Sequence, residues 1–308
     1  MTGRPATLRP EQVLAVVVSL TPAGEYWRLV LSAPAIASQV RPGHFVALAV
    51  GGPHTSMLLR RSFSVYRASD GLVEIVFSVA GKGTQWLAGV RPGEQVDVVG
   101  PVGRPFRLPV PGSTAVLVAG GYGSAPMFGL ADAIRSAGGT AHFVLGAATA
   151  GRLFGVDEAQ AGTGQVLVTT DDGSLGTHGR VTDVLGDLLT STGATTVYAC
   201  GPMPMLRAVA RMAESAGVAS QCAVEEAMAC GIGVCMTCVL PVRGDDGLTR
   251  MVRSCTDGPV FDGTAVRWDE VGTIPADTVG APHDAAAVAA LATTGQVRDE
   301  LVEEASAS

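Results

Sequence analysis

The hydrophobic pattern of residues 11–108 is one of short apolar segments separated by turns. These segments are rich in β-branched residues and include VLAVVVSL, YWRLVLS, HFVALAV and LVEIVFSVAG. The tripeptide RPG occurs at 41–43 and again at 91–93, each time just before a predicted strand. Regularly spaced strands with turn signals favour a small antiparallel barrel or sandwich. We therefore predict an antiparallel β-barrel domain over residues 1–110.

Between about residues 113 and 218 the pattern changes to strands alternating with helices. TAVLVAGG has the composition of a buried strand, APMFGLADAIRSAG that of an amphipathic helix, and TAHFVLGA that of the next strand. The alternation continues to PMLRAVARMAESAG. This regular alternation of strands and helices predicts a doubly wound parallel sheet. We assign this α/β nucleotide domain to residues 111–219.

The remainder of the chain is less regular. Residues 220–270 are loop-rich and cysteine-rich, and we assign them to a small cluster-binding domain. Residues 271–308 are Ala-rich and end in acidic residues, which suggests a mobile or weakly helical tail. A helix that docks on a partner is the alternative for this tail. The expected fold class is thus a multidomain β + α/β protein.

Composition narrows the possible partners and location. The 308 residues are 47% hydrophobic and carry a net charge of −7, so nothing in the charge suggests a nucleic-acid partner. No apolar run reaches membrane-spanning length, and the N-terminus does not resemble a signal peptide. We therefore expect a cytoplasmic protein with no membrane partner. In that reducing compartment, six cysteines suggest metal or redox chemistry rather than disulfides.

The segment RRSFSVY brings four candidate flavin contacts onto one predicted strand. Alternation places Arg61 and Phe63 on one side and Ser62 and Ser64 on the other. Arginine can hold a pyrophosphate through two parallel hydrogen bonds, an aromatic ring can pack on an isoalloxazine, and a serine hydroxyl can reach a ring nitrogen. A surface arginine beside a strand aromatic is the alternative reading.

A second motif, GKGTQWL at 81–87, follows in the same predicted barrel. Gly81, Gly83 and Thr84 could present backbone N–H groups to a phosphate at a helix start, although a glycine-rich hairpin turn is the alternative. GPVG at 100–103 would form a further tight turn. RRSFSVY, GKGTQWL and GPVG occur in this order within one predicted barrel. Together they indicate a flavin site more specifically than any one of them does alone.

The predicted α/β domain begins with a glycine loop. VLVAGGYGSAPMF runs from strand through loop to helix, and its Gly120, Gly121 and Gly123 permit a tight turn and close approach of a dinucleotide. The helix N-terminus adds its dipole. The spacing differs from G-x-G-x-x-G, so the loop alone is weak support.

A later segment, YACGPMPML at 198–206, strengthens the nucleotide prediction. It ends a strand of the same sheet, and ligands bind at the carboxyl ends of such strands. Cys200, Gly201 and Pro202 therefore fall where a nicotinamide would lie. A buried core thiol is the alternative for Cys200, and we do not expect it to act as a nucleophile.

Four cysteines have the ligand spacing of a plant-type [2Fe-2S] cluster. They are Cys230, Cys235, Cys238 and Cys255, in the pattern C-x4-C-x2-C followed by the fourth after sixteen residues. The intervening glycines would let the loop wrap a cluster and direct backbone N–H groups at its sulfurs. Zinc is the alternative, but structural zinc sites favour two close pairs of ligands.

The remaining cysteine of this region, Cys222, lies outside the spacing and is expected to be a core thiol. The three predicted sites make sense together, because nicotinamide gives up two electrons as hydride and a [2Fe-2S] cluster accepts one. A flavin can take the hydride and release electrons singly, while the protein fixes the geometry. We assign no further catalytic residue.

With these motifs the sequence resembles the electron-transfer subunits of dihydroorotate dehydrogenase B, within the ferredoxin-NADP reductase superfamily, over roughly residues 11–268. The resemblance implies that Arg61, Phe63 and Ser64 contact FAD, that GKGT surrounds its pyrophosphate and that AGGYGSAPM lies under the pyridine nucleotide. DDGSLGTHG, which contains Asp172 and Gly173, and CGPMPML would border the nicotinamide pocket. EEAMACGIGVCMTCVLPV and RSCTDGPVFDG resemble the cluster motif with all four cysteines present.

The resemblance implies a hetero-oligomeric protein that uses FAD, a [2Fe-2S] cluster and NAD(H), with an FMN-containing catalytic partner in pyrimidine biosynthesis. The sequence departs from the family at Ala148, where an arginine is expected, and Arg152 follows a few residues later. The sequence therefore leaves open whether the protein prefers NADH or NADPH. Two alternatives also remain, namely a reductase that supplies a different oxidoreductase and a non-catalytic redox sensor.

Overall fold

The structure, a computed structural model, describes residues 9–52, 55–162 and 164–281 of the chain. These residues fall into two compact units. The larger unit contains residues 9–239 together with 253–264, and the smaller contains 240–252 together with 265–281. In the described part of the chain, no helix is long and apolar enough to cross a membrane.

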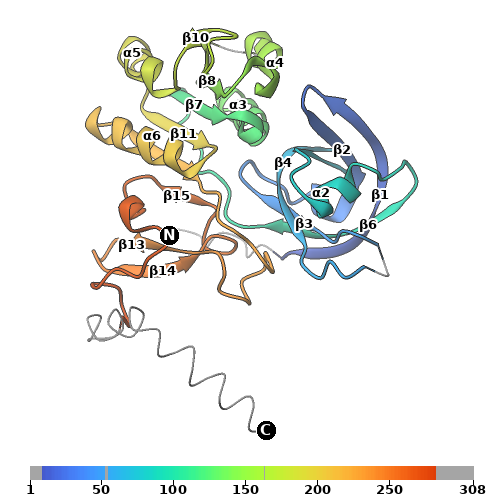
Figure 1. Cartoon of the computed structure of the whole chain (residues 1–308). Helices are drawn as coiled ribbons and strands as arrows, with labels where there is room; N and C mark the ends of the chain where they lie inside the picture. The colour runs from blue at the N-terminus through green and yellow to red at the C-terminus, as the bar shows by residue number, and fades with distance from the viewer. Residues whose placement is uncertain (1–8, 53–54, 163, 282–308) are drawn as a thin grey trace. The chain divides into compact units, whose positions relative to one another are not determined.

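The first part of the larger unit is a closed six-stranded antiparallel barrel, which confirms the predicted β domain (Figure 1). Alternate residues of its strands point inward, so that Leu29, Leu31, Leu48 and Ile75 are fully buried in one core. The strands pair in the order β1-β2-β5-β4-β3-β6. Their bounds are β1 Glu11–Ala23, β2 Tyr26–Ser32, β3 Phe45–Leu48, β4 Arg61–Ser69, β5 Leu72–Phe77 and β6 Gln95–Val102, with short helices α1 Pro34–Ala37 and α2 Lys82–Leu87.

The second part is a seven-stranded sheet in the order β10-β9-β8-β7-β11-β12-β15. Six strands are parallel and β15 runs antiparallel to β12, so the predicted doubly wound domain is confirmed. The strands are β7 Thr114–Gly120, β8 Thr140–Ala147, β9 Val166–Thr170, β10 Thr177–His178, β11 Thr196–Cys200, β12 Ala219–Ala223 and β15 Val260–Asp262. The helices are α3 Ala125–Ser136, α4 Val156–Gly162, α5 Thr182–Thr192 and α6 Met203–Ser215, with 3-10 turns η1 Gly121–Ser124 and η2 Ala150–Arg152.

The edge strand β15 follows the cysteine segment in the sequence. Residues 220–270, assigned above to cluster binding, therefore also supply a strand to the nucleotide sheet. A three-residue strand has too short a pattern to be found by periodicity. The consequence is that the chain enters the nucleotide sheet shortly after Cys255, the last of the four clustered cysteines.

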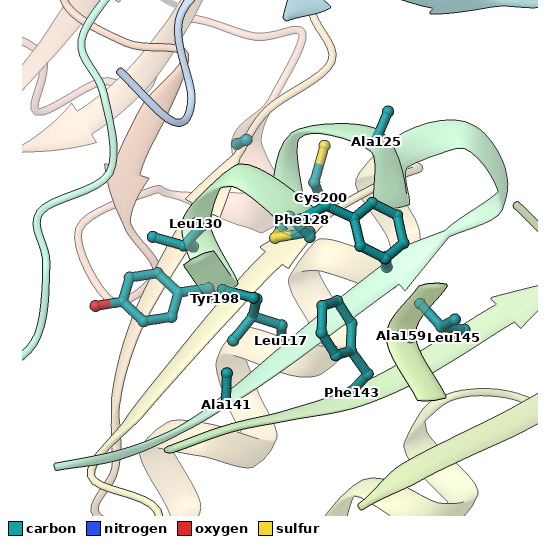
Figure 2. Close-up of a cluster of buried hydrophobic side chains, with 14 of the residues drawn as sticks. Leu117, Ala125, Phe128, Leu130, Ala141, Phe143, Leu145, Ala159, Tyr198 and Cys200 are labelled. Atoms are coloured by element: carbon teal, nitrogen blue, oxygen red, sulfur yellow. The ribbon is translucent and has the colours of Figure 1, made fainter. Parts of the chain in front are cut away.

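The core of the sheet is aromatic on the side that faces α3 (Figure 2). The Phe128 ring from α3 stacks on Phe143 from β8, with ring centroids 5.5 Å apart. Tyr198 is completely buried, and its hydroxyl donates a hydrogen bond to the Arg107 carbonyl at 2.8 Å. A buried phenol needs such a partner, so this bond removes the cost of burying its oxygen.

Polar and aromatic contacts join the barrel to the sheet domain inside the larger unit. The Tyr66 hydroxyl of β4 donates a 2.6 Å hydrogen bond to Glu158 of α4, and Arg67 pairs with both Glu158 and Asp132. The Tyr66 ring also packs edge-on against Phe154 at 5.5 Å. These contacts join the strand that carries RRSFSVY to the nucleotide domain.

The smaller unit contains most of a two-stranded sheet, β13 Val239–Arg243 and β14 Thr249–Arg253, together with the 3-10 turn η3 Trp268–Glu270. Its Arg267 bridges Glu270 and Asp277, the latter at 2.6 Å. The first residues of the predicted tail, 271–281, thus include one partner of an ion pair. Residues 282–308 of that tail lie outside the described residues.

We expect Phe143→Ala to lower the free energy of unfolding by about 3–5 kcal/mol, because it removes a buried ring and leaves a cavity. Chemical denaturation of the purified protein measures this change. Leu108→Ala is the control, since Leu108 is 49% exposed and its truncation should cost less than about 0.5 kcal/mol. Equal losses for the two variants would contradict the core assignment.

Candidate functional site

The first cavity, of about 350 Å³, lies beside strand β4 and is lined by all four residues predicted there. Arg61 and its neighbour Arg60 stand at its wall, and Arg60 is held by a 2.6 Å ion pair with Asp97. Phe63 packs against Phe77 with ring centroids 5.7 Å apart. The cavity residues from the motif are Arg61, Ser62, Phe63 and Ser64.

The start of α2, which carries the second predicted motif, lies against this arginine. A Cβ atom on Gly83 would sit only 2.9 Å from Arg61 Nε, so a side chain here would displace the guanidinium. The Thr84 hydroxyl lines the cavity side of the loop and accepts hydrogen bonds from the N–H groups of Ala80 and Gly81, at 2.9 and 3.1 Å. Thr84 therefore shapes the loop, and the Gly81 N–H already has a partner inside the protein.

A second cavity, of about 560 Å³, lies at the carboxyl ends of the parallel strands. Three of the predicted nucleotide contacts, Gly120, Gly121 and Pro202, line it. Gly123 and Cys200 instead line the first cavity, so the glycine loop contributes to both. Gly201 lies between two lining residues with φ of +152°, a conformation that favours glycine.

The glycines of this loop are required by packing between two strand ends. A Cβ on Gly123 would lie 2.7 Å from the Cys200 carbonyl oxygen, and one on Gly120 would lie 2.8 Å from Pro202 Cδ. Strands β7 and β11 are paired neighbours in the sheet. The loop therefore needs glycine for close approach of backbone to backbone, whether or not a dinucleotide is bound.

The charged residues of the second cavity are Arg152, Asp171, Arg180 and Glu225. Asp171 is the first residue of the motif DDGSLGTHG, from which the sequence singled out Asp172 and Gly173, whereas Arg180 lies just beyond that motif. Asp171 follows β9 directly and so stands at the ligand edge of the sheet. Arg152 lines the same cavity as Ala148. Position 148 is the one at which the family resemblance predicts an arginine. It pairs with Glu25 at 3.4 Å.

The predicted contacts Asp172 and Gly173 line neither cavity. The Asp172 carboxylate accepts hydrogen bonds from the Ser174 hydroxyl and N–H, at 2.6 and 3.0 Å, which lowers its pKa. Gly173 has φ of +74° in the same turn. Both residues shape the loop that carries Asp171, and their contact with a nucleotide stays a prediction.

Cys200 is a buried thiol that lines the first cavity. It is 5% exposed, and burial raises its pKa well above the ordinary value. A thiol of this kind stays protonated at neutral pH and is a poor nucleophile, as expected from the sequence. Figure 2 shows its sulfur beside Ala125 and Phe128, at the start of α3.

The cysteine loop presents backbone N–H groups to its own sulfurs. Cys230 Sγ accepts from the N–H groups of Ile232 at 3.4 Å and Val234 at 3.3 Å. Cys238 Sγ accepts from the Cys255 N–H at 3.4 Å. Such hydrogen bonds stabilise thiolates and tune an iron–sulfur centre.

The four thiols share one neighbourhood. Hydrogen bonds involving Thr237 and Cys230 lower the pKa of Cys235 to about 6, whereas burial and then Cys238 and Cys230 raise that of Cys255 to about 12. Within the described ranges, no three His, Cys, Asp or Glu side chains are close enough to form a finished metal site. Four thiols with N–H donors nonetheless match the ligand set of a [2Fe-2S] cluster, and their role as ligands stays a prediction.

Cys222 is separate from this group. It is fully buried, and its Sγ lies 4.0 Å from the Leu206 carbonyl oxygen. This is the core position expected from the sequence.

One aromatic side chain belongs both to the first cavity and to the surroundings of two cysteines. Phe45 lines the cavity and also packs in a buried cluster with Cys238, Cys255 and Val102. Met228 likewise lines the cavity and packs on this cluster. The cavity beside β4 therefore shares Tyr122 and Glu225 with the second cavity, and shares Phe45 with the cluster that contains Cys238 and Cys255.

A barrel, a nucleotide sheet and a cysteine loop arranged in this way define the class of reductases with a ferredoxin-NADP reductase fold and an added iron–sulfur segment. Family comparison matches residues 117–211 to an oxidoreductase NAD-binding domain and residues 225–267 to the iron–sulfur cluster binding domain of dihydroorotate dehydrogenase B. The chain belongs to the family of dihydroorotate dehydrogenase B electron transfer subunits.

Two relatives illustrate this membership. The dihydroorotate dehydrogenase B (NAD(+)) electron transfer subunit of Bacillus caldolyticus is 40% identical over 239 residues, which is 76% of this chain and 90% of that protein. The subunit of the same name from Desulforamulus reducens is 34% identical over 239 residues, which is 77% of this chain and 90% of that protein. Among solved structures, a chain of an NADH-dependent reduced ferredoxin-NADP oxidoreductase superposes with a TM-score of 0.73 at 31% identity, covering 88% of this chain and 93% of that one.

We expect the single variants Cys230→Ser, Cys235→Ser, Cys238→Ser and Cys255→Ser each to lose the cluster while NADH still reduces the flavin. Iron and acid-labile sulfide per protein measure the loss. Cys222→Ala is the matched control and should keep its iron, because Cys222 lies in the core away from the other thiols. Unchanged iron content in any of the four variants would remove that residue from the ligand set.

We expect Arg61→Ala to lower FAD occupancy after dialysis by about tenfold, since a bidentate hydrogen bond to a phosphate is lost. The exposed Arg91 provides the control variant Arg91→Ala, which should keep full occupancy. The flavin-to-protein absorbance ratio reports both. An unaltered ratio for Arg61→Ala would place the flavin pyrophosphate elsewhere.

Proposed function

We propose that the protein is the electron transfer subunit of an NAD-dependent dihydroorotate dehydrogenase, passing electrons between NAD(H) and an FMN-containing catalytic subunit. The observation that carries the proposal is the order of three neighbouring sites. The second cavity, at the carboxyl ends of the parallel strands, shares Tyr122 and Glu225 with the cavity beside β4, and that cavity shares Phe45 with the pair Cys238 and Cys255.

The residues present fit FAD, NAD(H) and a [2Fe-2S] cluster in that arrangement. Bound FAD exchanges a hydride with a nicotinamide and single electrons with an iron–sulfur cluster. Arg61 would hold its pyrophosphate, with Phe63 and Ser64 beside the ring system. Gly120, Gly121 and Pro202 would contact the pyridine nucleotide, and the four cysteines would hold the cluster.

The cysteine loop carries an apolar surface that fits a protein partner. Ile232, Val234 and Met236 alternate along the loop and are 48%, 76% and 53% exposed. Val234 and Met236 flank Cys235 in the sequence, and Cys235 is itself exposed. Exposed apolar groups in one short loop mark an interaction site, and a partner that takes electrons must come close to the cluster.

Dihydroorotate itself would be oxidised on the partner subunit, and this is the chain's proposed link to pyrimidine biosynthesis. We place the complex in the cytoplasm. All six cysteines are free thiols, and a reducing compartment keeps them available for a cluster.

A second candidate is a reductase that supplies electrons to another oxidoreductase through the same three cofactors. It is favoured by the 31% identity and near full-length superposition with a chain of the NADH-dependent reduced ferredoxin-NADP oxidoreductase. The two candidates share the same sites and differ only in the partner.

Anaerobic purification from the native host through an N-terminal tag separates these candidates. The proposed function predicts an FMN-containing companion and NAD-linked dihydroorotate oxidation in the eluate. A different oxidoreductase in the eluate, without dihydroorotate oxidation, would favour the second candidate and contradict the first.

We expect Val234→Asp to reduce the affinity for the partner subunit by roughly a hundredfold, because a carboxylate would be buried in an apolar contact. NADH oxidation with ferricyanide should stay unchanged. The control Val110→Asp changes a residue of matched exposure, 77%, on the loop between barrel and sheet, and should leave affinity unaltered. Equal loss in both variants, or none in Val234→Asp, would exclude the cysteine loop as the docking surface.

A further inference from the structure

The hairpin β13–β14 connects two of the four candidate cluster ligands. Cys238 directly precedes β13, and Cys255 follows β14 after one residue, Ser254. Ser254 donates from its N–H and from its hydroxyl to the Cys238 carbonyl, at 2.8 and 2.9 Å. The Cys255 N–H donates to Cys238 Sγ at 3.4 Å, and both thiols are buried. The pairing of the two strands therefore fixes the third and fourth cysteines next to each other.

Residues 265–281, which we call the C-terminal strap, begin along the β13 edge of this hairpin. The Arg243 N–H donates to the Ala265 carbonyl at 2.8 Å, and the Arg267 N–H donates to the Pro241 carbonyl at 3.0 Å. These bonds have the antiparallel pattern of a third strand. The first part of the strap thus covers the free edge of β13.

The end of the strap covers the other edge of the hairpin. The Leu248 carbonyl accepts from the Gly244 N–H across the hairpin at 2.9 Å. The next carbonyl, that of Thr249, points to the opposite side, because successive peptide groups of a strand alternate in direction. It accepts from the Val279 N–H at 2.9 Å. The strap therefore satisfies backbone groups on both edges of β13–β14.

A polar contact joins the two halves of the strap. The Arg267 side chain donates to the Thr249 hydroxyl at 2.7 Å and to Asp277 at 2.6 Å, and it also pairs with Glu270. The Thr249 hydroxyl in turn donates to Asp277 at 3.3 Å. Arg267 is only 18% exposed, whereas Asp277 is 60% exposed. One largely buried arginine therefore connects the β13 half of the strap to the β14 half.

A two-stranded hairpin alone is marginally stable in water, and its pairing is lost more readily when its edges are open. We infer that the C-terminal strap is a clamp on the cluster site, which keeps the hairpin paired and so retains Cys238 and Cys255 as a ligand pair. This inference rests on the proposed function, in which these thiols bind the cluster, and it adds Arg267 and Asp277 as positioning residues. Residues 268–281 lie beyond the matched cluster-binding domain.

The clamp acts on the opening of the hairpin. When β14 separates from β13, the hydrogen bonds of Ser254 and Cys255 to Cys238 are lost and iron can be released. Pairing with the strap raises the free energy of this opening and therefore slows the loss of iron. No residue of the strap lines either of the two cavities described above. The strap should therefore affect retention of the cluster without affecting reduction of the flavin by NADH.

Two substitutions at one position test the clamp. Val279 is 56% exposed, so Val279→Ala removes little packing and keeps the N–H, whereas Val279→Pro removes the donor to Thr249. Hydrogen exchange of the full-length protein, read by mass spectrometry on the peptide that contains Ser254 and Cys255, measures opening of the hairpin. Exchange should be about fivefold faster in Val279→Pro, since one backbone hydrogen bond is lost, and should change by less than about twofold in Val279→Ala.

The same two variants, purified without oxygen, report on the cluster. Transfer of iron to an excess of a colorimetric chelator should be about fivefold faster in Val279→Pro and within about twofold of wild type in Val279→Ala. The electron paramagnetic resonance signal of the dithionite-reduced protein should change shape in Val279→Pro alone, because the hydrogen bond from the Cys255 N–H to Cys238 Sγ is loosened. A loss of overall stability without this loosening leaves the shape of the signal unchanged.

A second pair of variants covers the case in which Val279→Pro fails to fold. Asp277→Ala breaks the exposed end of the ion pair with Arg267, and should speed iron loss by about two- to threefold. Glu25→Ala is its control, because it breaks an ion pair of the barrel whose carboxylate is 54% exposed, and it should leave iron loss as in wild type. Equal iron loss in these two variants would overturn the clamp.

The inference and the proposed function fail in different ways. Equal exchange rates in Val279→Pro and Val279→Ala would overturn the clamp, as would faster iron loss in Val279→Pro without faster exchange. Wild-type protein purified without oxygen that contains no iron or acid-labile sulfide would contradict the proposed function itself, and with it the role of the clamp.

Discussion

The ends of strands β7 and β11 lie so close together that no side chain fits between them. A Cβ on Gly123 would meet the Cys200 carbonyl oxygen at 2.7 Å, and backbone atoms cannot move aside as a flexible side chain can. This contact lets the glycine loop line both cavities and brings Tyr122 to their boundary. The junction between the two cavities therefore depends on one close approach of the glycine loop to the backbone of β11.

On its other side, the cavity beside β4 depends on the packing of the cysteine loop. Phe45 from β3 contacts the buried Cys238 and Cys255 in one cluster. A Cβ on Gly231 would lie 3.3 Å from Ser62 Oγ, so the loop also lies directly against β4. Strand β4, which carries the candidate flavin contacts, and its neighbour β3 thus both contact the segments that hold the cysteines.

Much of this arrangement follows from the sequence, because residue periodicity separates the barrel from the sheet and the β4 motif brings its own four residues together. Contacts between distant segments leave no local pattern. The short strand β15, the Asp171 carboxylate in place of Asp172, and the double role of Phe45 all depend on tertiary proximity. Tyr122 was missed for the same reason, since the glycines around it carried the recognisable signal.

The central claim is that electrons pass from the nucleotide through the flavin to the cysteine-bound cluster within this one chain. An anaerobic titration of the holoprotein with NADH, followed by visible absorption and by electron paramagnetic resonance, tests it most directly. The account predicts that the flavin absorbance bleaches and that the signal of a reduced [2Fe-2S] cluster appears in the same titration. Bleaching of the flavin with a cluster that stays oxidised throughout would contradict it.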